Sequence, residues 1–342
     1  MKRTHRVSIK KSTLIVVLAV LGTAGVCLAG DYDQDFTLRF PAAMSRFATY
    51  GDVAAVGGAS AGSKWSSSVN PASLTWLDAN NTVCASQQYS RLWFGNGTGM
   101  NAPAESVTVN TGKYGSFIVG AAQINTNRRD IGDGLDFEFT GDMDEVGWAK
   151  KISDDWAFGG AFSYTKSVTN DRYFGTDYVK GNSDSYVIRG GALHRIVDKW
   201  LGGLVLDYGW SSDRTAIYTD PEMHLRDSTR QFLVRPGVSF EYMKDCTYYL
   251  DYQFGTFWND TGTMNVHRIY TGVDHALTDW LFLRAGTAID PGVMNCAWTC
   301  GIGFYPTKWL SLDVGYQYDM FPEIHQEFGR SHTLNASLSF SF

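Results

Sequence analysis

The chain has 342 residues, of which 44% are hydrophobic and 14% aromatic, and its 35 acidic residues outnumber its 29 basic ones. An acidic chain without a basic cluster lacks the electrostatic footprint of a nucleic-acid-binding protein, so nucleic acid is not expected as a partner. After the first thirty residues, no stretch approaches the roughly 18 consecutive apolar residues of a membrane-spanning helix.

Residues 1–29 have the three parts of a secretory signal peptide. A basic region covers residues 2–11, an apolar region covers 14–21, and residues 27–29 place small side chains around a cleavage site. A lipoprotein signal is the alternative, but it needs a small residue directly before Cys27, where Val26 stands. Removal of this segment takes away five basic residues and no acidic ones, which leaves 24 basic and 35 acidic residues and a formal net charge of −11.

From about residue 82 to the end, apolar and polar residues alternate in segments bounded by turn formers, which indicates β-strands. The second face of these segments is rich in Gly, Asp, Ser, Gln and Arg, unlike the Lys, Glu and Thr of a soluble sandwich. Lipid on the apolar side and a polar lumen on the other predict a transmembrane antiparallel β-barrel. Segment 204–210 is an example, with the outward set Leu204, Leu206, Tyr208 and Trp210.

Tight turns and longer connections alternate along this region and predict the number of strands. A polar pair precedes a Trp at 154–156, 198–200, 278–280 and 307–309, with weaker copies at 111–114 and 244–246. Longer polar connections are predicted near 95–103, 126–134, 169–184, 213–228, 258–263, 290–295 and 320–330. Short periplasmic turns and long outer loops are typical of such barrels. Six turns and seven loops predict about 14 strands. The first strand then begins, and the last strand ends, on the periplasmic side.

The last predicted strand has one apolar face that ends on an aromatic residue, formed by Leu334, Ala336, Leu338, Phe340 and Phe342. This ending is typical of bacterial barrels recognised by the barrel-insertion machinery, so Phe340 and Phe342 are the candidate insertion signal. We therefore expect a bacterial outer-membrane protein whose partners include that machinery and outer-membrane lipid.

Residues 30–81 do not look like strands, because the run from 50 to 62 consists largely of Gly, Ala and Ser. The large side chains of Phe40, Phe47, Trp65 and Trp76 are poor choices for a solvated tail. The sequence therefore favours an N-terminal plug, or hatch, inside the lumen over a flexible periplasmic extension.

With these features the sequence resembles the FadL-type family of outer-membrane transporters for long-chain fatty acids and hydrocarbons. The Gly/Ala-rich run 51–62 leads to Asn70-Pro71-Ala72, which looks like the family's hatch motif, although Ser73 replaces the Gly that often follows. The motif is either a rigid turn inside the plug or an ordinary turn before the barrel. The resemblance implies passive uptake: a hydrophobic ligand enters at the outer loops and leaves when the hatch shifts, with no nucleotide, metal or other cofactor.

Charged residues on the polar strand faces are expected to point into the lumen. They are Arg189, Asp207, Arg235, Glu241, Asp251, Arg268, Asp274, Arg284 and Asp313. Mixed charges in one lumen are expected to pair and to anchor the plug, because an unpaired buried charge is costly. Alternatively, an arginine at 235, 268 or 284 binds the carboxylate of an amphipathic ligand. Segment 320–324 forms an apolar patch that either captures the ligand or packs on the rim.

Four cysteines follow the signal segment: Cys84, Cys246, Cys296 and Cys300. Export permits disulfides, but on one extended strand Cys296 and Cys300 would lie about 13 Å apart, beyond bridging distance. They can pair only if residues 295–301 turn. No His stands at ligand spacing from them, so no metal site is expected.

Transport of a hydrophobic or amphipathic small molecule is the leading functional hypothesis. A barrel that anchors or shuttles a partner protein in secretion, and a general porin, are the alternatives. An enzyme is not expected, since the seven His are scattered and form no recognisable Ser/His/Asp set.

Overall fold

The computed structural model describes residues 32, 34, 36–47, 50–63, 68–76, 83–126, 129–130, 134–218, 223–243 and 245–342. The predicted signal peptide and Trp65 lie outside this set. No helix in these residues is long and apolar enough to cross a membrane.

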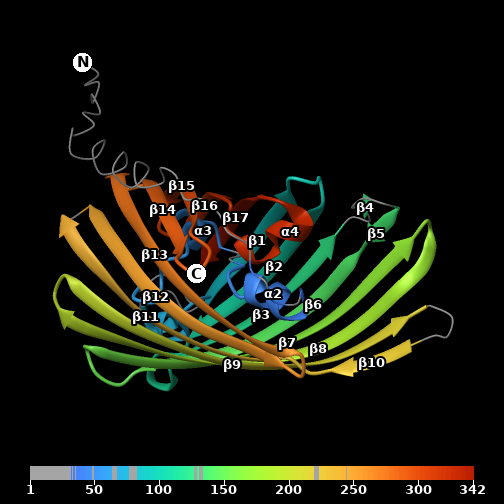
Figure 1. Cartoon of the computed structure of the whole chain (residues 1–342). Coiled ribbons are helices and arrows are strands. Elements are labelled where there is room, and N and C mark those ends of the chain that lie inside the picture. Colours follow the sequence, from blue (N-terminus) through green and yellow to red (C-terminus); the bar gives the residue numbers. More distant parts are fainter. Residues whose placement is uncertain are drawn as a thin grey trace, which may run out of the picture.

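Over the described residues, fourteen long antiparallel strands close into one barrel (Figure 1). The barrel closes because β1 pairs with β17 on one side and with β2 on the other. This confirms the predicted barrel and its strand number. The strands are β1 (Val83–Phe94), β2 (Gly99–Asn110), β3 (Ser116–Thr126), β6 (Phe139–Lys151), β7 (Trp156–Tyr173), β8 (Thr176–Val197), β9 (Trp200–Ile217), β11 (Arg230–Met243), β12 (Cys246–Asn259), β13 (Gly262–Thr278), β14 (Leu281–Asp290), β15 (Asn295–Thr307), β16 (Leu310–Tyr318) and β17 (Ser331–Ser341).

Side chains alternate between lipid and lumen as the sequence predicts. On β9, Leu206 and Tyr208 are each 43% exposed on the outer surface, whereas Val205 and Asp207 are 4% and 7% exposed inside. The same alternation on β17 turns Leu334 outward and buries Asn335.

All six predicted tight turns lie at one end of the barrel, here called the turn end, and one of them contains the short helix η2 (Gly112–Tyr114). The other end, here the loop end, carries the longer connections, including β4 (Arg129–Asp130), β5 (Leu135–Phe137), β10 (Met223–Asp227), η3 (Pro322–Ile324) and α4 (His325–Phe328). Two predicted loops are wrong. Residues 169–184 continue β7 and β8 to a turn at 174–175, and the connection at 258–263 shortens to two residues between β12 and β13.

The physical reason is that a strand need not end where the membrane ends. Thr and aromatic residues in 169–184 favour strand, and β7 and β8 pair from Trp156↔His194 to Tyr173↔Thr176 with one shift of register between Asp171 and Arg172. Polarity alone therefore does not locate the end of the hairpin.

The described part of the N-terminal segment forms α2 (Phe36–Met44), α3 (Gly51–Ala55) and η1 (Pro71–Trp76), and no strand. At the loop end, Arg39 of α2 pairs with Glu327 of α4. In the middle of the lumen, α3 packs on β15 and β16, and at the turn end Ala72 of η1 packs on Ala157. The segment thus crosses the lumen from the loop end to the turn end (Figure 1).

Inward-facing glycines on the strands make room for this segment. At each of these positions a Cβ atom would lie within 3.0 Å of an atom of residues 51–72, so no other residue type fits without a shift. The segment therefore lies directly against the backbone of the barrel wall. The positions are Gly159, Gly191, Gly203, Gly237, Gly272, Gly286, Gly301 and Gly315.

Neighbouring glycines on β8 test this packing. A Cβ at Gly191 would lie 2.2 Å from Asn70 Oδ1, so we expect Gly191→Ala to lower the free energy of unfolding by about 1–3 kcal/mol through overpacking. At Gly190 the nearest heavy atom would be 4.0 Å away, so Gly190→Ala is the matched control, with an expected change within about 0.5 kcal/mol. Urea titration in detergent micelles measures both, and equal effects would contradict the packing.

Candidate functional site

A cavity of about 860 Å³ lies inside the barrel beside the N-terminal segment. Aromatic side chains from α2 and from the start of β6 form one part of its lining. The Phe36 and Phe40 rings lie 5.5 Å apart, and Phe40 meets Phe139 edge to face at 5.4 Å. A largely apolar hollow with a few placed polar groups is the usual form of a small-molecule site.

The Asn-Pro-Ala motif is a fixed turn at the turn end of the lumen. Asn70 Oδ1 accepts a hydrogen bond from the Ala72 amide at 3.0 Å, and Asn70 Nδ2 donates to Ala61 O at 2.7 Å and to Ala192 O on β8 at 3.0 Å. The motif therefore bridges two parts of the N-terminal segment and the barrel wall. Asn70 is fully buried and is absent from the cavity lining.

Arg189 and Asp207 form the first of the predicted lumen pairs. Arg189 Nε and Nη2 donate to the two Asp207 carboxylate oxygens at 2.9 and 3.1 Å, and Nη1 donates to Ser68 O at 2.6 Å. The pair thus bonds to the backbone of the N-terminal segment as well as across the β8–β9 ladder.

Arg235 and Asp251 repeat this arrangement on β11 and β12. Arg235 Nε donates to Asp251 Oδ2 at 3.0 Å, and its Nη2 donates to Gly58 O. Asp251 Oδ2 also accepts from the Ser60 and Ala61 amides, at 2.7 Å each. The guanidinium stacks over the Tyr270 ring, 4.2 Å from its centroid.

Arg284 is the centre of a third group. Its Nε lies 3.1 Å from Asp274, its Nη1 2.5 Å from Asp313, and its Nη2 donates to Tyr305 Oη at 2.7 Å. Glu241, which completes the predicted set, is half-buried near the turn end.

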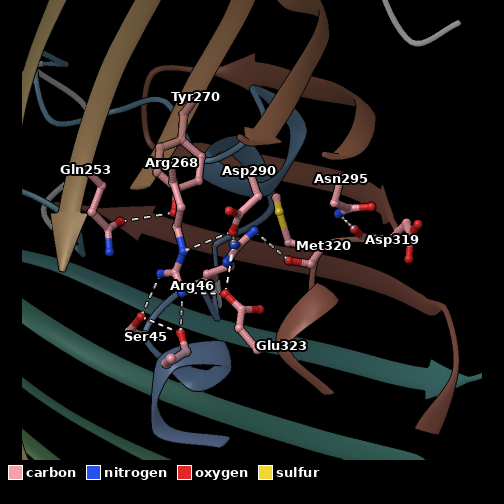
Figure 2. A network of polar contacts seen from close by, with 11 residues as sticks. Ser45, Arg46, Gln253, Arg268, Tyr270, Asp290, Asn295, Asp319, Met320 and Glu323 are labelled. Carbon is pink, nitrogen blue, oxygen red and sulfur yellow. Dashed lines mark hydrogen bonds and ion pairs between the residues drawn. The ribbon is translucent and has the colours of Figure 1, made fainter. Parts of the chain in front are cut away.

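Arg268 belongs to a buried ion cluster that includes residues the sequence analysis missed (Figure 2). Its Nη2 donates to Glu323 Oε1 at 2.5 Å and to Ala42 O at 2.8 Å. Arg46, just after α2, pairs with Asp290 and lies 2.8 Å from the same Glu323 oxygen. The side chains of Arg46, Arg268, Asp290 and Glu323 are at most 1% exposed. Arg46 could have been predicted as a member of this cluster, because it is a charged residue within the predicted plug.

The last connection folds into the barrel rather than outward. Met320, Phe321 and Ile324 are 0–1% exposed and pack with residues of α2 in one core cluster. Segment 320–324 therefore packs as the second alternative predicted, while Met320 also lines the cavity. Its apolar side chains hold the loop against the N-terminal segment.

The cysteines do not form the one bridge considered from sequence. Cys296 and Cys300 lie on β15, which is extended from Asn295 to Thr307, so they are too far apart to bond to each other. Among the described residues no group of three His, Cys, Asp or Glu side chains could hold a metal ion.

No protein-family model and no curated protein sequence matches the chain. Solved structures do. The Pseudomonas putida toluene transporter TodX is similar with a TM-score of 0.58 and 11% identity, over 86% of this chain and 98% of TodX. The monoaromatic hydrocarbon channel CymD is similar with a TM-score of 0.60 and 13% identity, over 86% of this chain and 97% of CymD.

The chain has the fold of these hydrocarbon-channel barrels. At this level of identity the likeness concerns architecture, and it confirms the FadL-type barrel and the strand number predicted from the sequence. Nearly the whole of each neighbour is matched, so the chain corresponds to the complete barrel of these proteins rather than to a part of it.

In this FadL-type fold, the buried ion cluster should be sensitive to loss of one charge. We expect Glu323→Gln to lower the free energy of unfolding by about 3 kcal/mol, because two guanidinium groups lose their shared carboxylate in a dry site. Asp177→Asn removes the same charge from an exposed pair with Arg172 and should cost less than about 1 kcal/mol. Urea unfolding compares them, and equal losses would show that the cluster does not stabilise the fold.

Proposed function

We propose that the protein is an outer-membrane channel through which hydrophobic or amphipathic small molecules pass without an energy source. The observation that carries this proposal is the cavity of about 860 Å³ inside a closed barrel, lined in part by aromatic side chains and by residues of the N-terminal segment. The similar structures, named as a toluene transporter and a monoaromatic hydrocarbon channel, support it.

We propose further that residues 30–81 act as the plug and residues 82–342 as the barrel. The paired charges support the anchoring role considered above, because Arg189, Arg235 and Arg268 each also donate to a backbone carbonyl of the N-terminal segment. Uptake then requires a local shift of this segment rather than its expulsion. Phe340 and Phe342 stay a predicted insertion signal.

Uptake and conductance together test the channel. Cells that lack the chain and cells in which it is restored are compared for uptake of long-chain fatty acids and aromatic hydrocarbons, and restoration should increase uptake. In planar bilayers the same protein should show almost no steady ion current, because residues 36–47, 50–63 and 68–76 lie in the lumen. Unchanged uptake would contradict the proposal, and a large steady current would favour a general porin.

The aromatic lining provides a second test. Removing the ring of Phe40 takes away an apolar contact of about 1.5 kcal/mol, so Phe40→Ala should weaken binding of a hydrophobic fluorescent probe roughly tenfold. Phe162 on β7 faces outward and is 39% exposed, so Phe162→Ala is the control and should leave affinity unchanged. If both variants bind like the unsubstituted protein, the aromatic lining is not the binding surface.

A further inference from the structure

Three neighbouring strands expose hydroxyl groups to the cavity. Their register aligns these groups in rows across the sheet: Thr165 faces Ser185, which faces Ser211. Adjacent strands lie about 4.8 Å apart, and each hydroxyl can donate and accept, so one polar group of a ligand can reach several. The cavity-lining hydroxyl residues of β7, β8 and β9, here called the hydroxyl wall, are Ser163, Thr165, Ser167, Thr169, Ser183, Ser185, Ser211 and Thr215.

Three of the four arginines that line the cavity are already engaged. Arg46, Arg189 and Arg235 each pair with a carboxylate and donate to a backbone carbonyl. The fourth, Arg230, is exposed and stands in register with Trp210 and Trp258 on the outward-facing set of β11. Inside the lumen, a ligand carboxylate would have to displace a protein carboxylate to pair with any of the other three.

Negative charge adjoins the hydroxyl wall directly. Glu145 on β6 accepts a hydrogen bond from Ser163 at 2.9 Å, and Asp213 accepts one from Ser211 at 2.9 Å. Both acids line the cavity. A second anion placed on this wall would meet repulsion in a partly dry site and gain no partner of opposite charge.

We propose that the cavity selects uncharged amphiphiles, with an apolar body against the aromatic lining and a hydroxyl or ether head on the hydroxyl wall. This inference rests on the proposed function and narrows it. In this proposal the lumen arginines only anchor the N-terminal segment. Thr165, Ser185 and Ser211 recognise the head group.

Three probes with the same twelve-carbon chain separate the possibilities: dodecan-1-ol, dodecanoate and dodecane. The full chain in lipid nanodiscs at pH 8, where dodecanoate is ionised, is titrated with each probe in competition with a bound hydrophobic fluorophore. We expect dodecan-1-ol to compete at a concentration at least tenfold lower than dodecanoate.

Substitutions then locate the head group. The triple variant Thr165→Val, Ser185→Ala, Ser211→Ala should weaken binding of dodecan-1-ol roughly tenfold and leave binding of dodecane unchanged. Ser212→Ala, one residue away on the outer face of β9, is the control and should change neither. Heat-dependent gel mobility reports whether each barrel is folded. If the triple variant does not fold, the single variant Ser185→Ala is used in its place.

The outcomes test the head-group selectivity and the proposed channel function separately. Dodecanoate binding as tightly as dodecan-1-ol, or a folded hydroxyl-wall variant that keeps full affinity for the alcohol, overturns the selectivity and leaves the proposed channel in place. If none of the three probes competes with the fluorophore on a folded barrel and uptake is also unchanged, the proposed function itself fails.

Discussion

The structure depends on supplying hydrogen-bond partners to an irregular backbone inside a barrel. Residues 54–63 and 68–72 belong to no sheet, so those amides and carbonyls that do not bond within the segment must bond to the barrel wall or remain unpaired at high cost. Asp251 accepts from two consecutive amides, while Thr299 and Gln317 donate to the carbonyls of Ala55 and Ala54. The arginine and carboxylate pairs of the lumen therefore hydrogen-bond to the backbone of the segment as well as to each other.

The barrel could be predicted from sequence because its constraints are local. Alternation with period two follows from one face meeting lipid, and a polar pair before a Trp identifies a turn at the membrane interface, so β9 and the turn at 198–199 could be read directly. The turn at Asn70-Pro71-Ala72 is local only in part, since Asn70 accepts from the Ala72 amide but also donates to Ala61 O and Ala192 O. Where polarity was used to end a strand, as at 169–184, the prediction was wrong because the pairing of β7 and β8 continues through these polar residues.

The site could be predicted only in part, because pairing across the lumen is not a local property. Arg268 and Glu323 are 55 residues apart, and the sequence does not reveal that Arg46 shares the same Glu323 oxygen. The same holds for Gly203, which as a sequence feature is an ordinary strand glycine and becomes informative only when Ala61 O is found beside it. The inward direction of Arg189 and Arg235 was predictable, whereas their bonds to Ser68 and Gly58 were not.

The glycine positions also constrain the order of assembly. Residues 51–72 contact strands from β7 to β16, so the surface that receives them is complete only when those strands are already side by side. The N-terminal segment is synthesised first, but it can dock fully only after most of the barrel strands have assembled around it. We expect biogenesis to pass through a barrel with an undocked N-terminal segment, an order that time-resolved proteolysis can follow.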